Sequence, residues 1–256
     1  KGFFGGGFSG ANLATVDKVT YSTDTTNAQT TANLSQSRSS LAGCSGEGTK
    51  GYFADQSITD VLVYFSEKTN AIASANLSSA RSNFCGISQG SSKGYFAGGQ
   101  IAAYLTTTDK LTYSNNTTAA QTTADLSQGR QALAGCSGER NKGYFVGGQT
   151  SATTFVSTTD KITYSNDTTV AQTTANLTTS TRSLSSVSNN VNKGYFAGGD
   201  TGSGGSPVKT VLAYLLVYST DTIAAQTTAN LSQARNGLAG VSEGSTKGYF
   251  AGGNTT

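Results

Sequence analysis

Few side chains in this sequence are of the kinds that commonly carry out catalysis. The 256 residues include no His, three Cys, and 14 Asp and Glu together. Without His, the sequence excludes a Ser-His-Asp triad and a His-containing zinc or copper centre. The acidic residues are thinly scattered, mostly in turn-like positions, and form no evident carboxylate pair. The composition therefore predicts a protein that is not an enzyme and that uses no cofactor and no metal.

The three cysteines are predicted to be buried apolar side chains rather than a disulfide framework. Cys44 and Cys136 occupy a position that holds Ile or Val in other copies of a repeat. Equivalent positions of non-adjacent repeats lie beyond disulfide reach. Cys85 stands where other copies have Ala or Ser. All three are therefore expected to pack as small hydrophobic residues.

One Arg recurs in each copy, and five guanidinium groups could bind an anionic sugar or a phosphate. A residue that every copy requires is more typical of contacts that hold the copies together. We therefore predict that these arginines are structural and bond to carbonyl groups or to an Asp of an adjoining repeat unit, such as Asp17, Asp60, Asp109 or Asp160. The net charge of +3 provides no basic stripe, so nucleic acid is not an expected partner. The five positions are Arg38, Arg81, Arg130, Arg182 and Arg235.

Four Asn-Leu-Ser/Thr segments match the pattern of N-glycosylation acceptors. The motif is short, and the repeat copies it. The four candidate glycosylation sites are Asn33, Asn76, Asn176 and Asn230.

The sequence Lys-Gly-Tyr-Phe, or Lys-Gly-Phe-Phe in the first copy, occurs six times at intervals of roughly fifty residues. Such a period indicates one supersecondary unit in tandem, which buries its apolar face only against its neighbours. We predict a single repeat domain over residues 1–256. Its repeats comprise residues 1–49, 50–92, 93–141, 142–192 and 193–246, with a partial repeat at 247–256. The repeated Lys is predicted to be a solvated turn residue, and the Gly pairs to permit close strand packing.

The unit after Arg130 shows the expected anatomy of one copy. Residues 131–137 alternate small and apolar side chains, as an inner strand would. A second strand at 142–148 ends in a Gly pair, a third covers 160–165, and a fourth covers 170–177. Turn residues separate the strands and no helical period occurs, which predicts an all-β fold. The longest apolar run, residues 211–218, is too short to cross a bilayer, so we expect a buried strand and no membrane insertion.

This order of elements resembles the kelch repeat, in which one strand closes on Gly-Gly, another ends in Tyr before a polar turn, and Arg follows a Leu. The resemblance covers the whole chain and implies a β-propeller of four-stranded antiparallel blades. The fourth strand departs from the motif because it lacks Trp. The wording of the repeats is also similar to tandem repeats in tail-fibre-like proteins of marine bacteriophages. The sequence predicts five inner strands, six Lys-Gly strands, and five each of the third and fourth strands. This total is one strand more than five four-stranded blades need, so five or six blades are expected.

The connections between the second and third strands vary most between copies. They cover residues 8–15, 55–59, 100–107, 149–158 and 200–209. Strand alternation places all five at one face, where rigid scaffolds commonly carry recognition loops. Tyr104 and Phe155 could stack on a sugar ring, with Gln100, Gln149 and Asp200 as hydrogen-bonding partners; the alternative is that both aromatic rings pack onto their own sheets.

The sequence therefore favours an adhesion or recognition protein on an extracellular or virion surface, with a glycan or a cell-surface receptor as its partner. The main alternative is a structural subunit whose repeats self-associate into a fibre or appendage. A catalytic propeller and an intracellular kelch adaptor are less favoured.

Overall fold

The computed structural model describes residues 1–46, 48–56, 58–202 and 206–255. Residues 203–205 of the fifth variable loop, residue 57 of the second loop and the last residue of the partial repeat lie outside this range. Within it, every regular element is a β-strand or a three-residue 3-10 helix, which confirms the all-β prediction. No described helix has the length and apolar character needed to span a membrane.

Four of the sheets have four antiparallel strands in the predicted order: inner, Lys-Gly-Tyr-Phe, third and fourth. Sheet 2 contains β4 (Ala42–Gly46), β5 (Lys50–Asp55), β6 (Ile58–Val63) and β7 (Lys68–Ala71). Sheet 3 contains β8 (Cys85–Gln89), β9 (Lys93–Ala97), β10 (Thr108–Thr112) and β11 (Thr117–Ala120). Sheet 4 contains β12 (Ala134–Gly138), β13 (Lys142–Val146), β14 (Thr159–Thr163) and β15 (Thr168–Ala171). Sheet 5 contains β17 (Ser185–Ser188), β18 (Lys193–Ala197), β21 (Ala213–Val217) and β22 (Thr222–Ala225).

Two further sheets of the repeat have fewer strands. Sheet 1 contains β1 (Gly2–Gly5), β2 (Val16–Thr20) and β3 (Thr25–Ala28). Sheet 6 contains β23 (Asn236–Ser242) and β24 (Gly248–Asn254), and β24 is the strand that the sequence predicts in excess of five sheets. From sheet 2 onward, each sheet begins one strand before its Lys-Gly-Tyr-Phe segment, with the inner strand. The predicted repeats begin at the Lys, so each of them contains the inner strand of the following sheet.

The predicted fourth strand, residues 170–177, extends too far. In sheet 4 it ends at Ala171, and residues 173–175 form a 3-10 helix instead. This helix buries Ala175 completely, and Asn176 Oδ1 then accepts the backbone N–H of Thr159 at 2.8 Å. The five 3-10 helices are η1 (Thr30–Ala32), η2 (Ala73–Ala75), η3 (Thr122–Ala124), η4 (Thr173–Ala175) and η5 (Thr227–Ala229).

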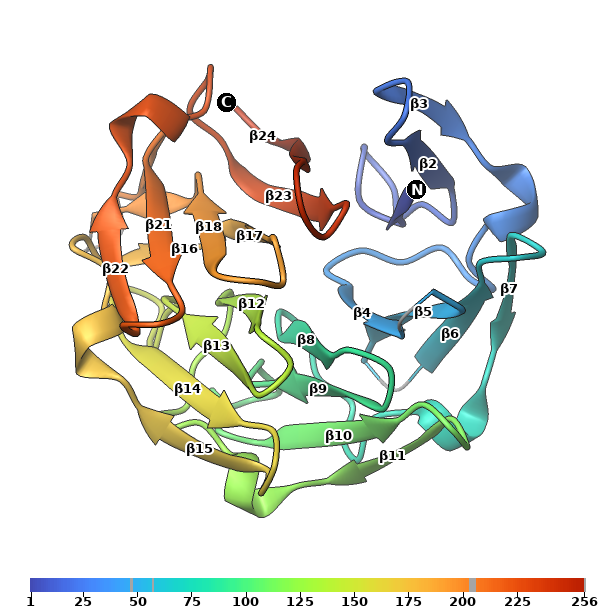
Figure 1. Cartoon of the computed structure of the whole chain (residues 1–256), viewed down its shortest axis with the longest axis horizontal. Helices are drawn as coiled ribbons and strands as arrows, with labels where there is room; N and C mark the ends of the chain where they lie inside the picture. The colour runs from blue at the N-terminus through green and yellow to red at the C-terminus, as the bar shows by residue number, and fades with distance from the viewer. Residues whose placement is uncertain (47, 57, 203–205, 256) are drawn as a thin grey trace.

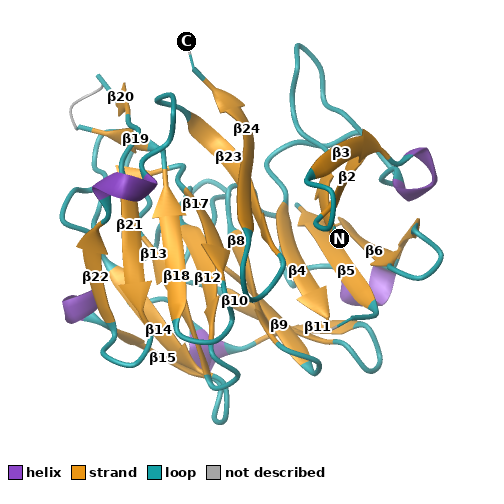
Figure 2. Cartoon of the chain, turned by 45° about the horizontal axis from the view of Figure 1, so that its top comes forward, coloured by secondary structure: helices purple, strands orange, loops and turns teal. Residues whose placement is uncertain are grey.

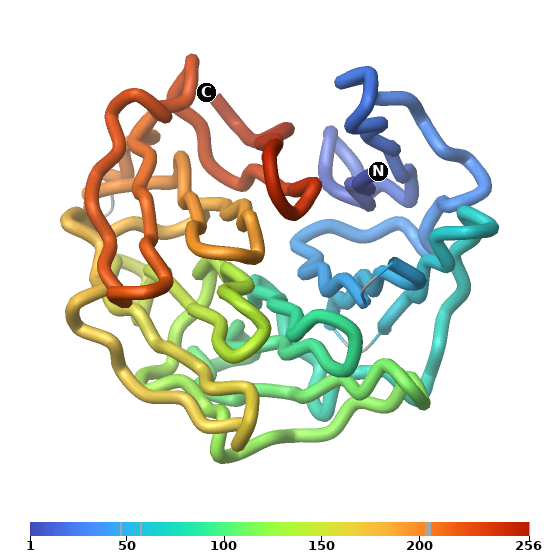
Figure 3. Tube along the Cα trace, in the orientation of Figure 1, coloured from blue at the N-terminus to red at the C-terminus, as the bar shows by residue number. Residues whose placement is uncertain are grey.

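Figures 1 and 3 show the six sheets following one another around a common centre, with the inner strands nearest to it. Successive inner strands are in contact, from β4 to β8, β12, β17 and β23. A chain of backbone bonds also runs from sheet to sheet: Ala132 N–H donates to Asn83 O (2.8 Å), Ser183 N–H to Ala132 O (2.7 Å), and Gly237 N–H to Ser183 O (2.9 Å). All four residues have positive φ, which turns their carbonyl groups toward the next copy.

Close approach of neighbouring sheets explains the Gly of Lys-Gly-Tyr-Phe. A Cβ atom on Gly143 would lie 2.6 Å from Ile87 Cδ1 of the preceding sheet and would also meet the Tyr164 hydroxyl. Cys44 contacts Gly94 in the same way, and Cys136 contacts Gly194. The cysteines are free and buried, as predicted, and burial raises the pKa of Cys136 to about 12, so its thiol stays protonated near neutral pH.

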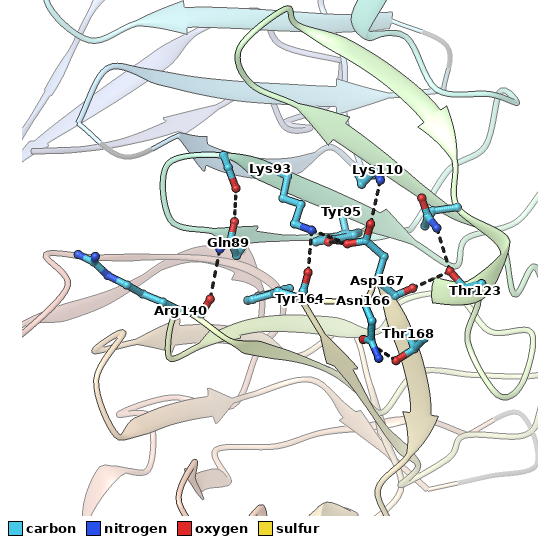
Figure 4. A network of polar contacts seen from close by, with 12 residues as sticks. Gln89, Lys93, Tyr95, Lys110, Thr123, Arg140, Tyr164, Asn166, Asp167 and Thr168 are labelled. Carbon is cyan, nitrogen blue, oxygen red and sulfur yellow. Dashed lines mark hydrogen bonds and ion pairs between the residues drawn. The ribbon is translucent and has the colours of Figure 1, made fainter.

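Five of the six repeated Lys residues bond to a neighbouring sheet, so the prediction of a solvated turn residue is wrong for them, whereas Lys193 is exposed. Lys93 Nζ donates to Tyr164 O (2.7 Å) and to Asp167 Oδ1 (2.5 Å) in the next sheet. Tyr95 also donates to Asp167, Lys110 forms an ion pair with it at 2.8 Å, and the Tyr95 and Tyr164 rings stack at 5.6 Å (Figure 4). The acceptor lies in the following repeat, so the sequence of one copy could not reveal this contact.

Sheets 6 and 1 meet through the same contacts that join sheets 3 and 4. Lys247 Nζ donates to Tyr21 O (3.0 Å) and to Asp24 (2.8 Å), and the Tyr21 and Tyr249 rings stack at 5.8 Å. The Tyr21 hydroxyl donates to Ser242 O at 2.9 Å. The last described sheet therefore packs directly on the first.

Three of the repeated arginines form buried ion pairs with the third strand of the sheet that they precede. Arg81 Nη1 lies 2.8 Å from Asp109 Oδ2, and Arg130 Nη2 lies 2.9 Å from Asp160 Oδ2. Arg38 pairs with Asp60 in the same manner. Each Arg lies in the connection between two sheets, and its Asp lies in the third strand of the sheet that follows. Because these charges are shielded from water, each depends on its partner.

We predict that Arg130→Gln lowers the free energy of unfolding by about 3–5 kcal/mol, because it leaves the Asp160 carboxylate buried without its cation. Arg235→Gln is the matched control, since Arg235 occupies the same position of the repeat but has no carboxylate partner among the described residues. The control should cost less than about 1 kcal/mol. Urea denaturation of both variants tests this, and equal losses would contradict the structural role.

We also predict an acid-sensitive contribution from Asp167. Burial alone would raise its pKa, but hydrogen bonds from Lys110, Lys93 and Tyr95 lower it from 3.8 to about 2. The contribution to stability is therefore fully present above about pH 4 and is lost as the pH falls toward 2. The urea midpoint of Asp167→Asn should lie below that of the parent protein at pH 6, and the two should converge near pH 2. A constant difference across this range would contradict the prediction.

Candidate functional site

Each variable loop follows the Lys-Gly-Tyr-Phe strand of its sheet. Because these strands all run in the same direction, the five loops lie at the same end of the sheets. Figure 2 shows β19 and β20 at this end, which β24 also approaches. The fifth loop is partly regular: β16 (Thr181–Arg182), β19 (Asp200–Thr201) and β20 (Val208–Lys209) form a small antiparallel sheet. In sheets 3 and 4, a β-bridge joins the residue that follows the Gly pair to the residue that follows the repeated Arg. In sheet 4 these residues are Gln149 and Gln131.

These Gly pairs have the backbone conformation that the close approach requires. Gly147 and Gly148 have φ of +66° and +105°. A Cβ on Gly147 would lie 2.5 Å from Thr181 O, and one on Gly148 would lie 2.6 Å from Gln131 O. The Gly pair therefore lets each second strand leave its sheet and deliver the next residue to the loop end.

Gln149 connects two neighbouring loops. Its Nε2 donates to the Tyr104 hydroxyl at 3.4 Å, and its Oε1 accepts a hydrogen bond from Arg182 Nη1. Only 4% of Gln149 is exposed. Its amide thus positions the Tyr104 side chain, which remains half-buried at the surface.

Arg182 is the centre of this arrangement, and the sequence analysis did not identify it as part of the site. Its guanidinium lies 4.4 Å from the Phe155 ring centroid, and its Nε lies 3.2 Å from Asp200 Oδ2. Asp200 in turn accepts two hydrogen bonds from Asn236 Nδ2, at 2.8 and 2.9 Å. We call Tyr104, Gln149, Phe155, Arg182, Asp200 and Asn236 the loop cluster.

A substitution in the third strand explains why Arg182 differs from the other arginines. In sheet 4, Asp160 lies opposite Phe145, whereas in sheet 5 Tyr214 lies opposite Phe196. Sheet 5 therefore lacks the carboxylate that holds an Arg in its interior, and Arg182 pairs with Asp200 at the loop end. The missing Asp in residues 211–214 was the sequence signal that could have identified Arg182 as exceptional.

The structure brings together the side chains of four of the five predicted ligand-binding residues, whereas the fifth, Gln100, joins them only through its backbone. Gln100 is half-buried and forms backbone bridges with Ser82 and Tyr104, but its side chain has no hydrogen bond to the loop cluster. Phe155 is only 8% exposed and lies against Arg182, which agrees with the alternative that this ring packs onto the protein rather than on a sugar. Gln149 and Asp200 are also buried and serve to hold the loops. Tyr104 and Gln100 remain accessible.

Three of the variable loops each expose an apolar side chain. Phe8 is 70% exposed, Ile101 57% and Val208 63%. Exposed apolar groups of this kind can contribute to an interaction site. The same face has a polar hollow of about 170 Å³, lined by side chains that include Asn12, Gln36 and Asp55. Burial raises the pKa of Asp55.

A larger hollow of about 420 Å³ lies at the opposite end, between sheets 2 and 3. Lys50 lines it together with Tyr113 and hydroxyl side chains. Lys50 Nζ donates to Asn116 Oδ1 at 3.0 Å, where the equivalent partner in the next sheet is Asp167. The ammonium is therefore not neutralised by that partner, and this hollow is suited to an anion.

The four predicted glycosylation sites have a structural role. Asn76 Oδ1 accepts the Thr59 N–H at 2.9 Å, and the other three Asn residues make the same bond. The one remaining copy, the third in the chain, has Asp125 at this position, and its Oδ1 accepts the Thr108 N–H at 2.8 Å. Since Asp retains the oxygen and has no amide nitrogen, the repeat selects the hydrogen-bond acceptor.

No family model matches the chain, and no curated protein matches it. Among the described residues, no group of three or more His, Cys, Asp and Glu is placed to hold a metal ion. The function is therefore inferred from the geometry of the loop end.

We predict that Arg182→Lys loosens the loop end without unfolding the protein. Lys cannot bond to Gln149 and Asp200 simultaneously while stacking on Phe155. Amide hydrogen exchange should accelerate within residues 149–155 and 200–201, with a loss of about 1–2 kcal/mol in global stability. Tyr104→Phe removes only one long hydrogen bond and should leave this exchange unchanged. Unchanged exchange in Arg182→Lys would show that the cluster does not depend on the Arg.

Proposed function

We propose that this chain is a kelch-like β-propeller that recognises a glycan on a cell surface through its variable loops, without catalysing a reaction. The antiparallel sheets arranged around a centre support the propeller assignment, together with the order of their strands. In this proposal the six sheets are blades, of which sheets 1 and 6 are incomplete. The protein acts outside the cell or on a virion surface, as a tail-fibre-like adhesin would.

The observation that carries the proposal is the combination of a rigid polar cluster with exposed apolar groups from separate loops. Arg182 and Asp200 neutralise one another, so the loop end does not select ligands by a strong net charge. Sugars present apolar ring faces beside hydroxyl groups, and such ligands suit accessible aromatic and amide side chains. Phe8, Tyr104 and Gln100 provide these groups, while Gln149 and Arg182 hold the loops in place.

Binding of the intact protein to an array of glycans tests the proposal. Phe8→Ala and Tyr104→Ala should each reduce binding by roughly tenfold, as expected for removal of an aromatic contact residue. Phe65→Ala is the matched control, because Phe65 is 99% exposed but lies in the turn between β6 and β7, at the other end of the sheets. It should leave binding unchanged. The proposal fails if no glycan binds or if all three variants bind equally.

Acidic glycans provide a second comparison on the same array. If they bind in the hollow beside Lys50, Lys50→Gln should abolish their binding and Phe8→Ala should have no effect. That result would move the glycan site to the opposite end of the protein and contradict the role of the loops.

A further inference from the structure

Sheet 2 has a much shorter variable loop than its neighbours. β5 ends at Asp55 and β6 begins at Ile58, whereas β13 ends at Val146 and β14 begins only at Thr159. In sheets 3 and 4 the longer loop forms a β-bridge to the residue after the repeated Arg, and sheet 2 has no such bridge among the described residues. The polar hollow of about 170 Å³ lies beside this short loop, and Arg38 lines it.

A guanidinium and a carboxylate line the hollow together. Arg38 is 5% exposed; its Nη1 donates to Ile58 O at 3.0 Å and its Nη2 pairs with Asp60, so it contributes mainly positive charge. Asp55 is 6% exposed, and its carboxylate has no hydrogen bond or ion pair with another side chain among the described residues. Burial raises the pKa of Asp55, whereas the Arg38 charge and the Gln56 N–H lower it. A ligand that donates hydrogen bonds would satisfy this buried carboxylate.

Uncharged polar side chains complete the lining of the hollow. All of them are exposed, and none forms a side-chain hydrogen bond with another residue in the part of the chain that the structure describes. They are Asn12, Gln36, Ser37 and Gln56. Because amides and hydroxyls both donate and accept hydrogen bonds, they suit a ligand whose groups do the same.

An exposed aromatic ring lies next to this polar lining. Phe8 forms an antiparallel β-bridge with Asn12 within the first variable loop. Residues opposite one another in such a pair have their side chains on the same side, with Cβ atoms about 4.5–5.5 Å apart. Phe8 is 70% exposed, so its ring is open to a ligand in the hollow. An aromatic ring beside polar groups suits the apolar face of a sugar.

The charges of the hollow favour a neutral ligand. Asp55 disfavours an anion, and the guanidinium of Arg38 disfavours a cation. The hydroxyls of a neutral sugar can donate to the carboxylate and accept from the amides. The volume is below the roughly 300–1,000 Å³ of sites for drug-sized ligands, so one sugar ring fits better than a longer chain.

We propose that this hollow binds one neutral hexopyranose ring of a glycan, with Phe8 stacked on its apolar face. Asp55 accepts hydrogen bonds from two hydroxyls on adjacent carbons, and the amides of Asn12, Gln36 and Gln56 bond to the remaining ones. This inference rests on the proposed glycan recognition and names the sugar class and the subsite.

Saturation-transfer NMR of the intact protein tests the subsite, with the methyl glycosides of glucose, galactose and mannose as probes. At least one of them should bind, and Asp55→Asn should weaken its binding by roughly tenfold, as expected for loss of hydrogen bonds to a charged group. Phe8→Ala should weaken it by a similar factor and leaves the interior intact, since Phe8 is exposed. The uronic acid of the same sugar should bind roughly tenfold more weakly, because Asp55 repels its carboxylate.

Asp125→Asn is the matched control, because it removes the same charge and because four other copies have Asn at this position. It should bind the glycoside normally. The urea midpoint of Asp55→Asn should equal or exceed that of the parent protein, since burial disfavours the charge of Asp55. A loss of binding in this variant then reports the missing contact with the sugar and not unfolding.

The proposal is overturned if Asp55→Asn and Asp125→Asn bind the glycoside equally, or if the uronic acid binds as well as the neutral sugar. Binding that EDTA abolishes would place a divalent cation in the hollow and would also overturn it. The glycan array separates this failure from that of the proposed function. If Tyr104→Ala reduces binding on the array and Asp55→Asn does not, glycan recognition stands and the subsite is wrong; if no glycan binds, both are wrong.

Discussion

The structure depends on how closely each second strand approaches the inner strand of the preceding sheet. Gly143 lies so near Ile87 that any side chain would collide with it, and four of the other five copies repeat this contact with Cys or Val. Close packing brings Tyr95 over Tyr164 and brings the ammonium of Lys93 to Asp167 in the next sheet. This one interface explains the positive charge of the Lys, the absence of a Cβ at the Gly and the stacked ring of the Tyr. It also explains why the second strand that carries them lies so close to the preceding sheet.

Departures from the repeat provide the candidate functions. Where Tyr214 replaces the buried Asp, Arg182 is not held in the sheet interior and organises the loop cluster instead. In sheets 2 to 4 the equivalent Arg is held by the Asp of the third strand. A side chain whose usual partner is replaced can contribute its interaction to a loop instead. Comparison with the regular copies thus shows which side chains of an irregular copy lack their usual partner and can make another contact.

Much of the fold could be predicted because local patterns specify it. Strand alternation, the Gly pairs and the turn residues identified all twenty-one strands of the repeat, and β16, β19 and β20 were the strands that they missed. The 3-10 helix after the fourth strand was not predicted because it depends on burial of Ala175 and on the Asn176 contact with Thr159. The candidate site was predicted in part: the loops were identified, but Phe155 is covered by Arg182, which the sequence analysis had placed among the structural arginines.

The sequence by itself determined the repeat, the all-β character and the end of the sheets at which the variable loops lie. These follow from periodicity and from residue types that act within a few positions of one another. Only the tertiary structure decided which Lys pairs with which acidic residue, which Arg is buried, and that sheet 6 packs on sheet 1. These contacts join residues from different copies. In a repetitive sequence every copy contains an equivalent partner, so the sequence alone does not say which partner is used. The order of the sheets around the centre decides which of these equivalent residues lies close enough to bond.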